Sequence, residues 1–321
     1  MVSRAEGLSR ADRDDFANIG LDQREILRDA LRWDREADAY GSGLLETLPR
    51  GLVAPRCFAI DNREASAWLW LEDITEGMLA WDVKRYALAA RHLGRFNGEY
   101  LTGRPIPEFP WLSRAWLQNW VRYFTTSSGP LLADDRVWAR PPTADLFPET
   151  LRADLRRLLA ESDRWWRALD RLPLVFSHLD AFRANLLSRA GPHGVETVAV
   201  DWAVAGIAPL GAEVAQLVIA SLFYHGDPAD PTELASQCLD GYGQGLSDAG
   251  YRVSESDLQR AYVINAVARW GLIIGPLGRV GDPASEEAMS RTFRFPFSRI
   301  IGMIAAKTRY LCAISRGVAL D

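Results

Sequence analysis

The sequence predicts an α+β protein with a small N-terminal part, residues 1–74, and a large, mainly helical C-terminal part, residues 75–321. Short apolar runs typical of strands lie before a polar connector near residues 72–76. Beyond the connector most segments have helical spacing, and one unit reads as a hairpin. A length of 321 residues exceeds one average domain and agrees with two unequal parts.

The N-terminal part is expected to contain one helix and two strands. Apolar residues spaced among charges predict an amphipathic helix over residues 22–40, which the glycines and prolines of residues 41–55 end. Residues 55–60 and 67–71 then read as strands around a short polar turn. The second strand leads into the sequence L-E-D-I, Leu71 to Ile74.

The C-terminal part begins with a helix predicted from Trp81 to Tyr100 and continues as mainly helical sequence. An apolar run over residues 261–277 briefly resembles a membrane span, but it contains Asn265 and Arg269 and stops at Pro276, so a core helix is predicted. Five tryptophans in helical stretches are expected to fill the core, because large aromatic side chains dominate burial. They are Trp111, Trp116, Trp120, Trp165 and Trp166.

The amino-acid composition indicates a folded protein and limits the partners to be expected. Hydrophobic residues make up 48% and charged residues 25% of the chain, as in folded proteins with a sizeable core. The net charge of −5 comes from interspersed charges, so no nucleic-acid partner is expected, and no membrane partner either. Cys57, Cys238 and Cys312 lack metal-ligand spacing and are expected to be buried structural thiols. With no signal-peptide core at the N-terminus, a cytoplasmic location is expected; the oligomeric state stays open.

Two neighbouring stretches carry a pattern of polar residues on apolar strands. Ser177 to Leu187 reads S-H-L-D-A-F-R-A-N-L-L, and Thr197 to Trp202 reads T-V-A-V-D-W. Glycine and proline between them are turn residues, so a β-hairpin is predicted. Asp180 and Asn185 would enter the hairpin and Asp201 would leave it, which brings three oxygen-bearing side chains to one end of a small sheet.

These residue types suit phosphoryl transfer. The reaction needs a carboxylate that orients the acceptor hydroxyl and oxygen ligands for Mg²⁺, which prefers carboxylate and amide oxygens. The spacing H-x-D-x-x-x-x-N, followed by a strand and an aspartate, is the arrangement of kinase catalytic loops. Turn capping by Asp180 and Asn185 would explain each residue singly, but not their spacing with Asp201. A serine hydrolase is disfavoured, because Ser177 and His178 are neighbours on an extended run and no G-x-S-x-G turn is present.

The motifs H-L-D-A-F-R-A-N and V-D-W-A-V-A-G-I-A-P-L-G-A-E-V-A-Q-L resemble those of the aminoglycoside phosphotransferase and choline-kinase-like group of small-molecule kinases. The resemblance extends over roughly Arg35 to Gly245, through R-E-A-D-A-Y, L-W-L-E-D-I and H-L-G-R-F-N-G. It implies a protein-kinase-like fold with a reduced N-terminal lobe and a large helical C-terminal lobe. It also implies ATP and Mg²⁺ as cofactors and transfer of the γ-phosphate to a hydroxyl of an aminoglycoside-, sugar- or choline-like molecule.

The resemblance also implies roles for individual residues. Asp180 matches the catalytic base, and Asn185 and Asp201 match the magnesium ligands. His178 would brace the loop, and Glu213 stands where the family has an acid that helps to brace the fold.

Nucleotide contacts follow from the same resemblance. Glu36 stands in the right place for the helix glutamate that pairs with a phosphate-binding lysine, or it is a surface acid among helical arginines. Glu72, Asp73 and Ile74 would offer backbone groups to an adenine ring, as the family hinge does. Arg183 either reaches a phosphate or is a solvated loop cation.

The sequence departs from the family at several positions. Leu179 replaces the usual glycine, and Phe182 stands where the family often has a basic residue. None of the 35 residues that precede Glu36 is a lysine or forms a glycine-rich strand–turn–strand, and the G-x-G-x-G run at residues 241–245 lacks a strand context. Two interpretations stay open. Either the phosphate-clamping sheet precedes the recorded start, or the chain is naturally short and is a catalytically silent nucleotide- or ligand-binding module.

Overall fold

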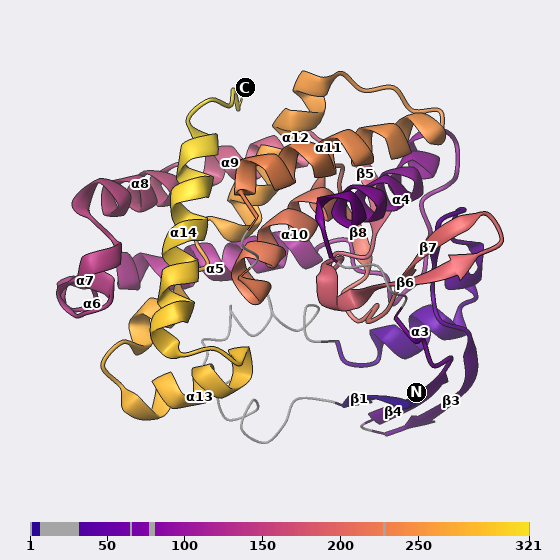
Figure 1. Ribbon diagram of the computed structural model, residues 1–321, viewed down its shortest axis with the longest axis horizontal. Helices are drawn as coiled ribbons and strands as arrows, with labels where there is room; N and C mark the ends of the chain where they lie inside the picture. The colour runs from indigo at the N-terminus through magenta and orange to yellow at the C-terminus, as the bar shows by residue number, and fades with distance from the viewer. Residues whose placement is uncertain (1, 7–31, 65, 77–80, 227–228, 321) are drawn as a thin grey trace.

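The computed structural model describes residues 2–6, 32–64, 66–76, 81–226 and 229–320. A small antiparallel sheet and one helix form the N-terminal region at the lower right of Figure 1, and a larger, mainly helical region fills the rest of the view. Small sheets and many helices together give the α+β composition that the sequence predicts.

The N-terminal sheet has the strand order β1-β4-β3 and is antiparallel throughout. Its strands are β1 (Val2–Glu6), β3 (Cys57–Arg63) and β4 (Ser66–Leu71). Along β4 the alternate residues Ala67, Leu69 and Leu71 are buried, whereas Trp70 is exposed. Strand β1 was not predicted, because V-S-R-A-E is polar and short. It forms by pairing its whole length with β4.

Two N-terminal predictions need correction. Strand β3 continues beyond the predicted end at Ile60 to Arg63, because its residues 61–63 pair with β4 despite their polar composition. Of the predicted helix 22–40, residues 22–31 lie outside the described residues. Residues 33 and 34 form a turn, and helix α3 (Arg35–Gly41) begins only after Asp34, whose side chain makes no capping hydrogen bond and pairs with Arg32 instead.

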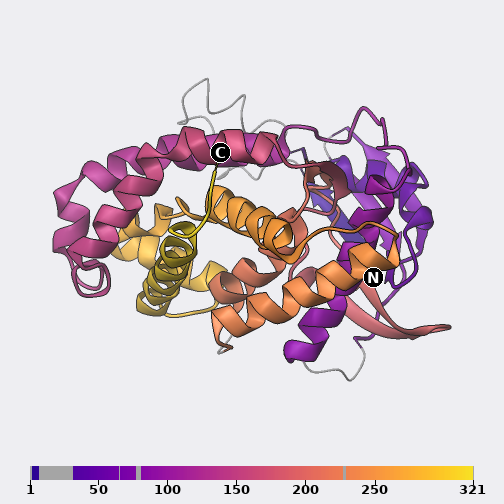
Figure 2. The ribbon, with the colours of Figure 1, turned by 90° about the horizontal axis from the view of Figure 1, so that it is seen from above.

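The C-terminal region consists mainly of helices. Helix α12 lies between α5 and α11, and α11 packs along α4 (Figures 1 and 2). The helices are α4 (Val83–Leu101), α5 (Trp116–Ala133), α6 (Asp135–Ala139), α7 (Thr143–Leu146), α8 (Glu149–Ala160), α9 (Ser162–Asp170), α10 (Ala212–Ala220), α11 (Pro231–Asp248), α12 (Glu255–Trp270), α13 (Pro283–Phe293) and α14 (Phe297–Ser315). The predicted helix 81–100 is thus confirmed as α4, with its ends shifted.

The glycines of residues 241–245 have a packing role in α11. A Cβ at Gly241 would lie 2.2 Å from the carbonyl oxygen of Ala87, and one at Gly245 would lie 2.0 Å from that of Arg91. Both glycines therefore let the backbones of α11 and α4 approach closely, and the G-x-G-x-G run is not a phosphate loop.

The predicted hairpin is confirmed. Strands β6 (Leu186–Gly191) and β7 (Gly194–Ala199) pair antiparallel, and the short β2 (Leu52–Val53) adds to β7 in parallel. A second pair, β5 (Leu174–Ser177) with β8 (Gly206–Pro209), lies before and after the hairpin in sequence. Residues 178–185 connect β5 to β6, and residues 200–205 connect β7 to β8.

The core lies among the helices of the C-terminal region. The stretch Glu255–Arg279 is long and apolar enough to cross a membrane, but 78% of its most apolar window is buried inside the protein, as expected of a core helix. Of the five tryptophans, Trp111, Trp116 and Trp165 are buried, and the other two pack partly buried against the core. Among the cysteines, Cys57 departs from expectation: it is only partly buried, because it lies on β3.

Candidate active site

The loop between β5 and β6 brings Asp180 and Asn185 into contact. The Asn185 side chain, at the end of the short 3₁₀ turn η2 (Arg183–Asn185), donates from Nδ2 to the Asp180 main-chain oxygen at 3.0 Å and to Asp180 Oδ2 at 2.9 Å. Gln216 Nε2 of α10 donates to the other carboxylate oxygen, Asp180 Oδ1, at 2.8 Å. Both oxygens of this carboxylate are therefore fixed by amide donors.

Two buried side chains brace the same loop. His178 Nε2 lies 2.9 Å from the Val200 oxygen, and the Asp180 N–H donates to His178 Nδ1 at 3.2 Å. Burial lowers the pKa of His178 to about 4, so the imidazole is neutral and uses one nitrogen as donor and the other as acceptor. Glu213 accepts the main-chain N–H groups of His178 and Leu179. These contacts are the bracing contacts that the resemblance implied for His178 and Glu213.

Leu179 has an unusual backbone conformation for a leucine. Its φ of 66° lies in the left-handed region that favours glycine, and its side chain is fully buried. Arg269 Nη1 donates to its carbonyl oxygen at 2.6 Å. A left-handed backbone at this position is one that glycine adopts without strain, which agrees with the glycine of the family pattern.

Asp201 leaves the hairpin directly after β7 and also has a left-handed backbone, with φ of 62°. The residue is exposed overall, yet desolvation of its carboxylate by the surrounding protein raises its pKa. The Ala203 N–H donates to this carboxylate. Such conformations cost about 1–3 kcal/mol each in a residue other than glycine and gather at functional sites. Leu179 and Asp201 place two of them around this hairpin.

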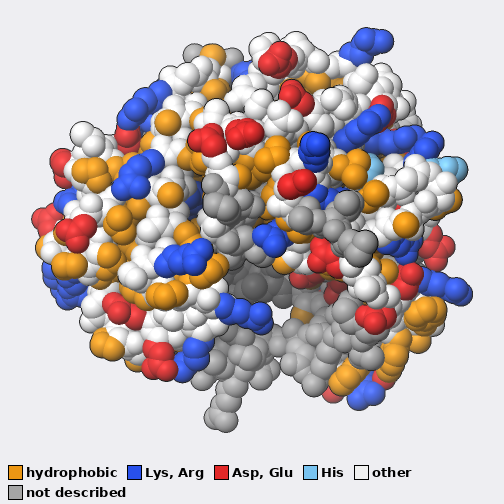
Figure 3. Space-filling model, in the orientation of Figure 1, with side chains coloured by type: hydrophobic (Ala, Val, Ile, Leu, Met, Phe, Trp, Pro, Cys, Tyr) orange, Lys and Arg blue, Asp and Glu red, His pale blue; other side chains and the backbone are white. Residues whose placement is uncertain are grey.

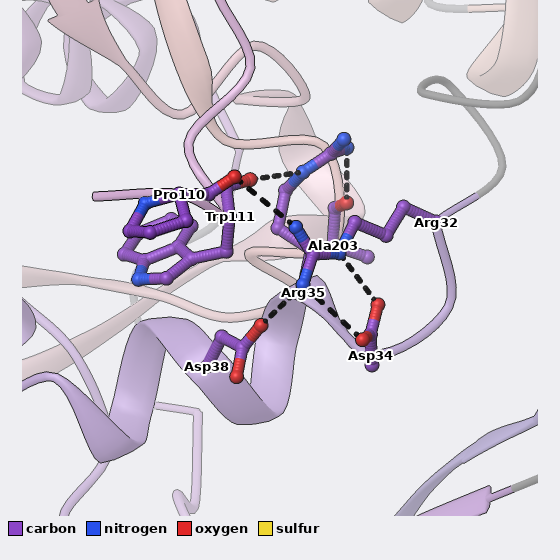
Figure 4. A network of polar contacts seen from close by, with 7 residues as sticks. All are labelled: Arg32, Asp34, Arg35, Asp38, Pro110, Trp111 and Ala203. Carbon is purple, nitrogen blue, oxygen red and sulfur yellow. Dashed lines mark hydrogen bonds and ion pairs between the residues drawn. The ribbon is translucent and has the colours of Figure 1, made fainter. Parts of the chain in front are cut away.

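Helix α3 holds the loop that follows Asp201. Glu36, 7% exposed, accepts the main-chain N–H groups of Asp201 and Trp202. Arg35, fully buried, donates from Nη1 to the Ala203 oxygen at 2.9 Å and from Nε to the Trp111 oxygen at 3.2 Å (Figure 4). Glu36 is thus a buried group beside Asp201 and not a surface acid.

Burial and the charge of Asp201 raise the pKa of two neighbouring acids, Asp180 and Glu36. Burial raises the pKa of Asp180 to about 6, Arg269 opposes the shift, and Asp201 adds to it. Burial, followed by the charge of Asp201, raises the pKa of Glu36 to about 7. The charge of Asp201 thus acts on both other acids, and a cation bound at Asp201 would relieve that repulsion.

The donors fit a magnesium ion. The Asn185 NH₂ group is directed at Asp180, which leaves the amide oxygen for a ligand, and the Asp201 carboxylate is open to solvent. Among the described ranges no group of three or more His, Cys, Asp or Glu side chains could hold a metal, so this set depends on an amide. One or two protein carboxylates, completed by water and phosphate oxygens, are usual for Mg²⁺.

The residues expected near the nucleotide differ in whether their main-chain N–H groups already have hydrogen-bond partners. The Glu72 N–H donates to the Arg56 oxygen at 2.8 Å, and its carboxylate pairs with Arg189 of β6 at 3.0 Å, so this residue already joins the N-terminal sheet to the hairpin. Asp73 and Ile74 make no main-chain hydrogen bond within the part of the chain that the structure describes. The main-chain N–H of Glu72 is therefore engaged, whereas those of Asp73 and Ile74 have no partner among the described residues, and the role of all three at the nucleotide stays a prediction. Arg183 is exposed on the loop.

Sequence reasoning missed two residues that shape this site. Gln216 binds Asp180, and Arg269 is the cation that acts on it. Each is a polar residue inside an apolar helical run, which was the signal available in the sequence; Arg269 served there only as an argument against a membrane span.

Neither a family model nor a curated protein sequence matches this chain. Solved structures do match. A microcompartment-associated aminopropanol kinase has a TM-score of 0.51 at 15% identity, over 89% of this chain and 84% of that one. An ethanolamine kinase of Plasmodium vivax has a TM-score of 0.51 at 12% identity, over 88% and 72%. An amicoumacin kinase in complex with AMP-PNP and Ca²⁺ has a TM-score of 0.49 at 14% identity, over 96% and 81%. Over most of its length the chain thus has the fold of these ethanolamine and aminopropanol kinases, in agreement with the small-molecule kinase motifs of the sequence.

Proposed function

We propose that this chain is an ATP- and Mg²⁺-dependent phosphotransferase that transfers the γ-phosphate to a hydroxyl of a small polar molecule, aminoglycoside-, sugar- or choline-like. The observation that carries the proposal is the fixed Asp180 carboxylate, bound by Asn185 and Gln216, next to the charge of Asp201. The likeness to small-molecule kinases supports the reaction class through the fold.

Asp180 is the proposed catalytic base. With its pKa raised to about 6, its ionised form predominates at neutral pH and is basic enough to accept a proton from an alcohol as the oxygen attacks. The two amide contacts fix the plane of the carboxylate, so an acceptor hydroxyl would be oriented when it binds.

Asn185 and Asp201 are the proposed metal ligands, through the amide oxygen and the carboxylate. When bound, Mg²⁺ would neutralise charge on the transferring phosphates. The chain's own contribution is to hold Asp201 in place through the contacts of its neighbouring backbone with Glu36.

The remaining nucleotide contacts are proposed on the N-terminal side. Residues 1–74 would be the reduced lobe and residues 75–321 the catalytic and substrate lobe. The free amides of Asp73 and Ile74 would bind an adenine ring, and Arg183 would reach a phosphate with its planar guanidinium.

One observation favours a second candidate, a catalytically silent kinase-like binding module. Among the described residues no cation contributes to the pKa of Glu36, whose partners are main-chain N–H groups. The two lysines of the sequence lie elsewhere: Lys84 is in the first turn of α4, and Lys307 is buried in α14, where Nζ donates to the Ile273 oxygen at 2.7 Å. Phosphate transfer separates the two candidates, because a silent module can bind Mg²⁺–nucleotide but transfers no phosphate from it.

The decisive experiment compares phosphate transfer by the unaltered chain and three variants. Purified protein receives ATP, Mg²⁺ and a panel of aminoglycosides, sugars, amino alcohols and nucleosides. We expect Asp180→Asn to lower the turnover of the accepted substrate by about 10²-fold or more while nucleotide binding is retained. Asp201→Asn should weaken Mg²⁺–nucleotide binding, and Asp163→Asn, an exposed acid of α9, should change neither. Equal transfer by all four proteins would refute the assignment.

A further inference from the structure

A pocket of about 480 Å³ lies outside the candidate active site. Its walls are the loop before β2, one face of α4 and the turn of the β6–β7 hairpin. Figure 3 shows basic side chains, with histidine beside them, gathered at the upper right of this face, over α4 and towards the tip of the hairpin. The basic residues that line the pocket are Arg50, Arg91, Arg95, His92 and His193.

The acids of the pocket are already paired. Asp248 receives two hydrogen bonds from Arg91, at 2.7 and 3.1 Å, and Glu196 receives one from Arg189 at 2.9 Å. The carboxylates that line this pocket therefore each have a hydrogen-bonded arginine partner. Among the described residues neither of the other two arginines of the lining is hydrogen-bonded to a carboxylate, although the charge of Asp248 also acts on Arg95.

Those two arginines are Arg50 and Arg95. Arg50 makes one long contact, from Nη2 to the His193 oxygen at 3.4 Å. Arg95 has no side-chain partner within the described ranges, and its Nε is buried without a hydrogen bond. Burying an unsatisfied guanidinium nitrogen is costly, so a ligand that accepts its hydrogen bonds would be stabilised there.

His92, on the pocket wall, is also subject to the positive charge of the neighbouring arginines. His92 Nδ1 lies 2.9 Å from Thr197 Oγ1 of β7. Burial, and then the charges of Arg85, Arg91 and Arg95, lower the pKa of His92 to about 4. The His92 imidazole is therefore neutral at physiological pH, and the arginines around it supply positive charge.

We propose that this pocket binds a phosphate-bearing small molecule through Arg50 and Arg95. Guanidinium groups bind phosphate oxygens in pairs, and a volume of this size suits a small ligand. The site is separate from the candidate active site. The turn of the hairpin lines the pocket, whereas Asn185 and Asp201 lie at the opposite end of the hairpin. Strands of this length span roughly 20 Å. A ligand here would join the loop before β2 to the hairpin, at a distance from the site of reaction.

The test is a calorimetric titration of the full chain with pyrophosphate at low ionic strength. EDTA keeps the candidate active site without a metal, so the outcome does not depend on the proposed function. The unaltered chain should bind pyrophosphate, and Arg50→Gln and Arg95→Gln should each weaken binding about tenfold. Arg95→Lys should recover part of the loss. Arg136→Gln, which removes an exposed arginine of α6 with its own ion-pair partner, should bind like the unaltered chain.

Either of two results would overturn the proposal: no binding at millimolar pyrophosphate, or equal binding by the pocket variants and the control. Thermal unfolding of each variant checks folding. Arg50 is exposed, so Arg50→Gln remains a valid variant even if the partly buried Arg95 proves necessary for stability.

Discussion

At Leu179 a glycine variant should be more stable than an alanine variant, which is the reverse of the usual order of stability. The residue is fully buried and has φ of 66°. Leu179→Ala removes buried side-chain volume, at a cost of about 2–5 kcal/mol, and keeps the conformational strain. Leu179→Gly loses the same packing but relieves the strain, which is worth about 1 kcal/mol or more for a residue in the left-handed region. The glycine variant should therefore be the more stable of the two by about 1 kcal/mol.

The matched control is Leu186, the first residue of β6. It is equally buried, but its φ of −122° is ordinary extended backbone. There glycine should be less stable than alanine by about 0.5–1 kcal/mol, because glycine loses more conformational freedom on folding. Urea unfolding followed by tryptophan fluorescence gives the unfolding free energy of all four variants. If Leu179→Ala proves as stable as Leu179→Gly while the Leu186 pair shows the ordinary order, the left-handed backbone at Leu179 is wrong.

Three further predictions concern buried polar groups. Gln216→Leu removes a donor that lowers the pKa of Asp180, so the acidic limb of a pH–activity profile should move to higher pH. Burial raises the pKa of Glu213 from 4.5 to about 7, so the folded chain holds a proton there that the unfolded chain releases; the unfolding free energy relative to Glu213→Gln should fall as pH rises between those values. Burial lowers the pKa of Lys307 from 10.5 to about 7, so the unfolding free energy relative to Lys307→Met should rise over that interval. Urea titrations at several pH values measure both differences, and a constant difference would contradict either one.

The hairpin and its polar residues were predictable because their information is local. Turn residues between Val-rich runs specify β6 and β7, and the spacing from Asp180 to Asn185 is set within one loop. Asp201 follows directly because β7 ends just before it. Helices with clear apolar spacing, such as α4, were predictable for the same reason.

The parts that failed depend on contacts between distant segments. Arg269 donates to the Leu179 oxygen across 90 positions of sequence, and Gln216 donates to Asp180 across 36. No local sequence pattern predicts either contact. Strand β1 is a polar pentapeptide that becomes a strand only because β4 offers a free edge. Arg35 of α3 likewise reaches the oxygens of Trp111 and Ala203, 76 and 168 positions away (Figure 4).

The contacts of α3 have a mechanical consequence. Two adjacent residues of this helix, Arg35 and Glu36, bind three successive residues after the hairpin, Asp201 to Ala203. A tilt of the helix must either break these bonds or carry Asp201 with it. Any movement of α3 that keeps these bonds would therefore shift the Asp201 carboxylate together with the helix.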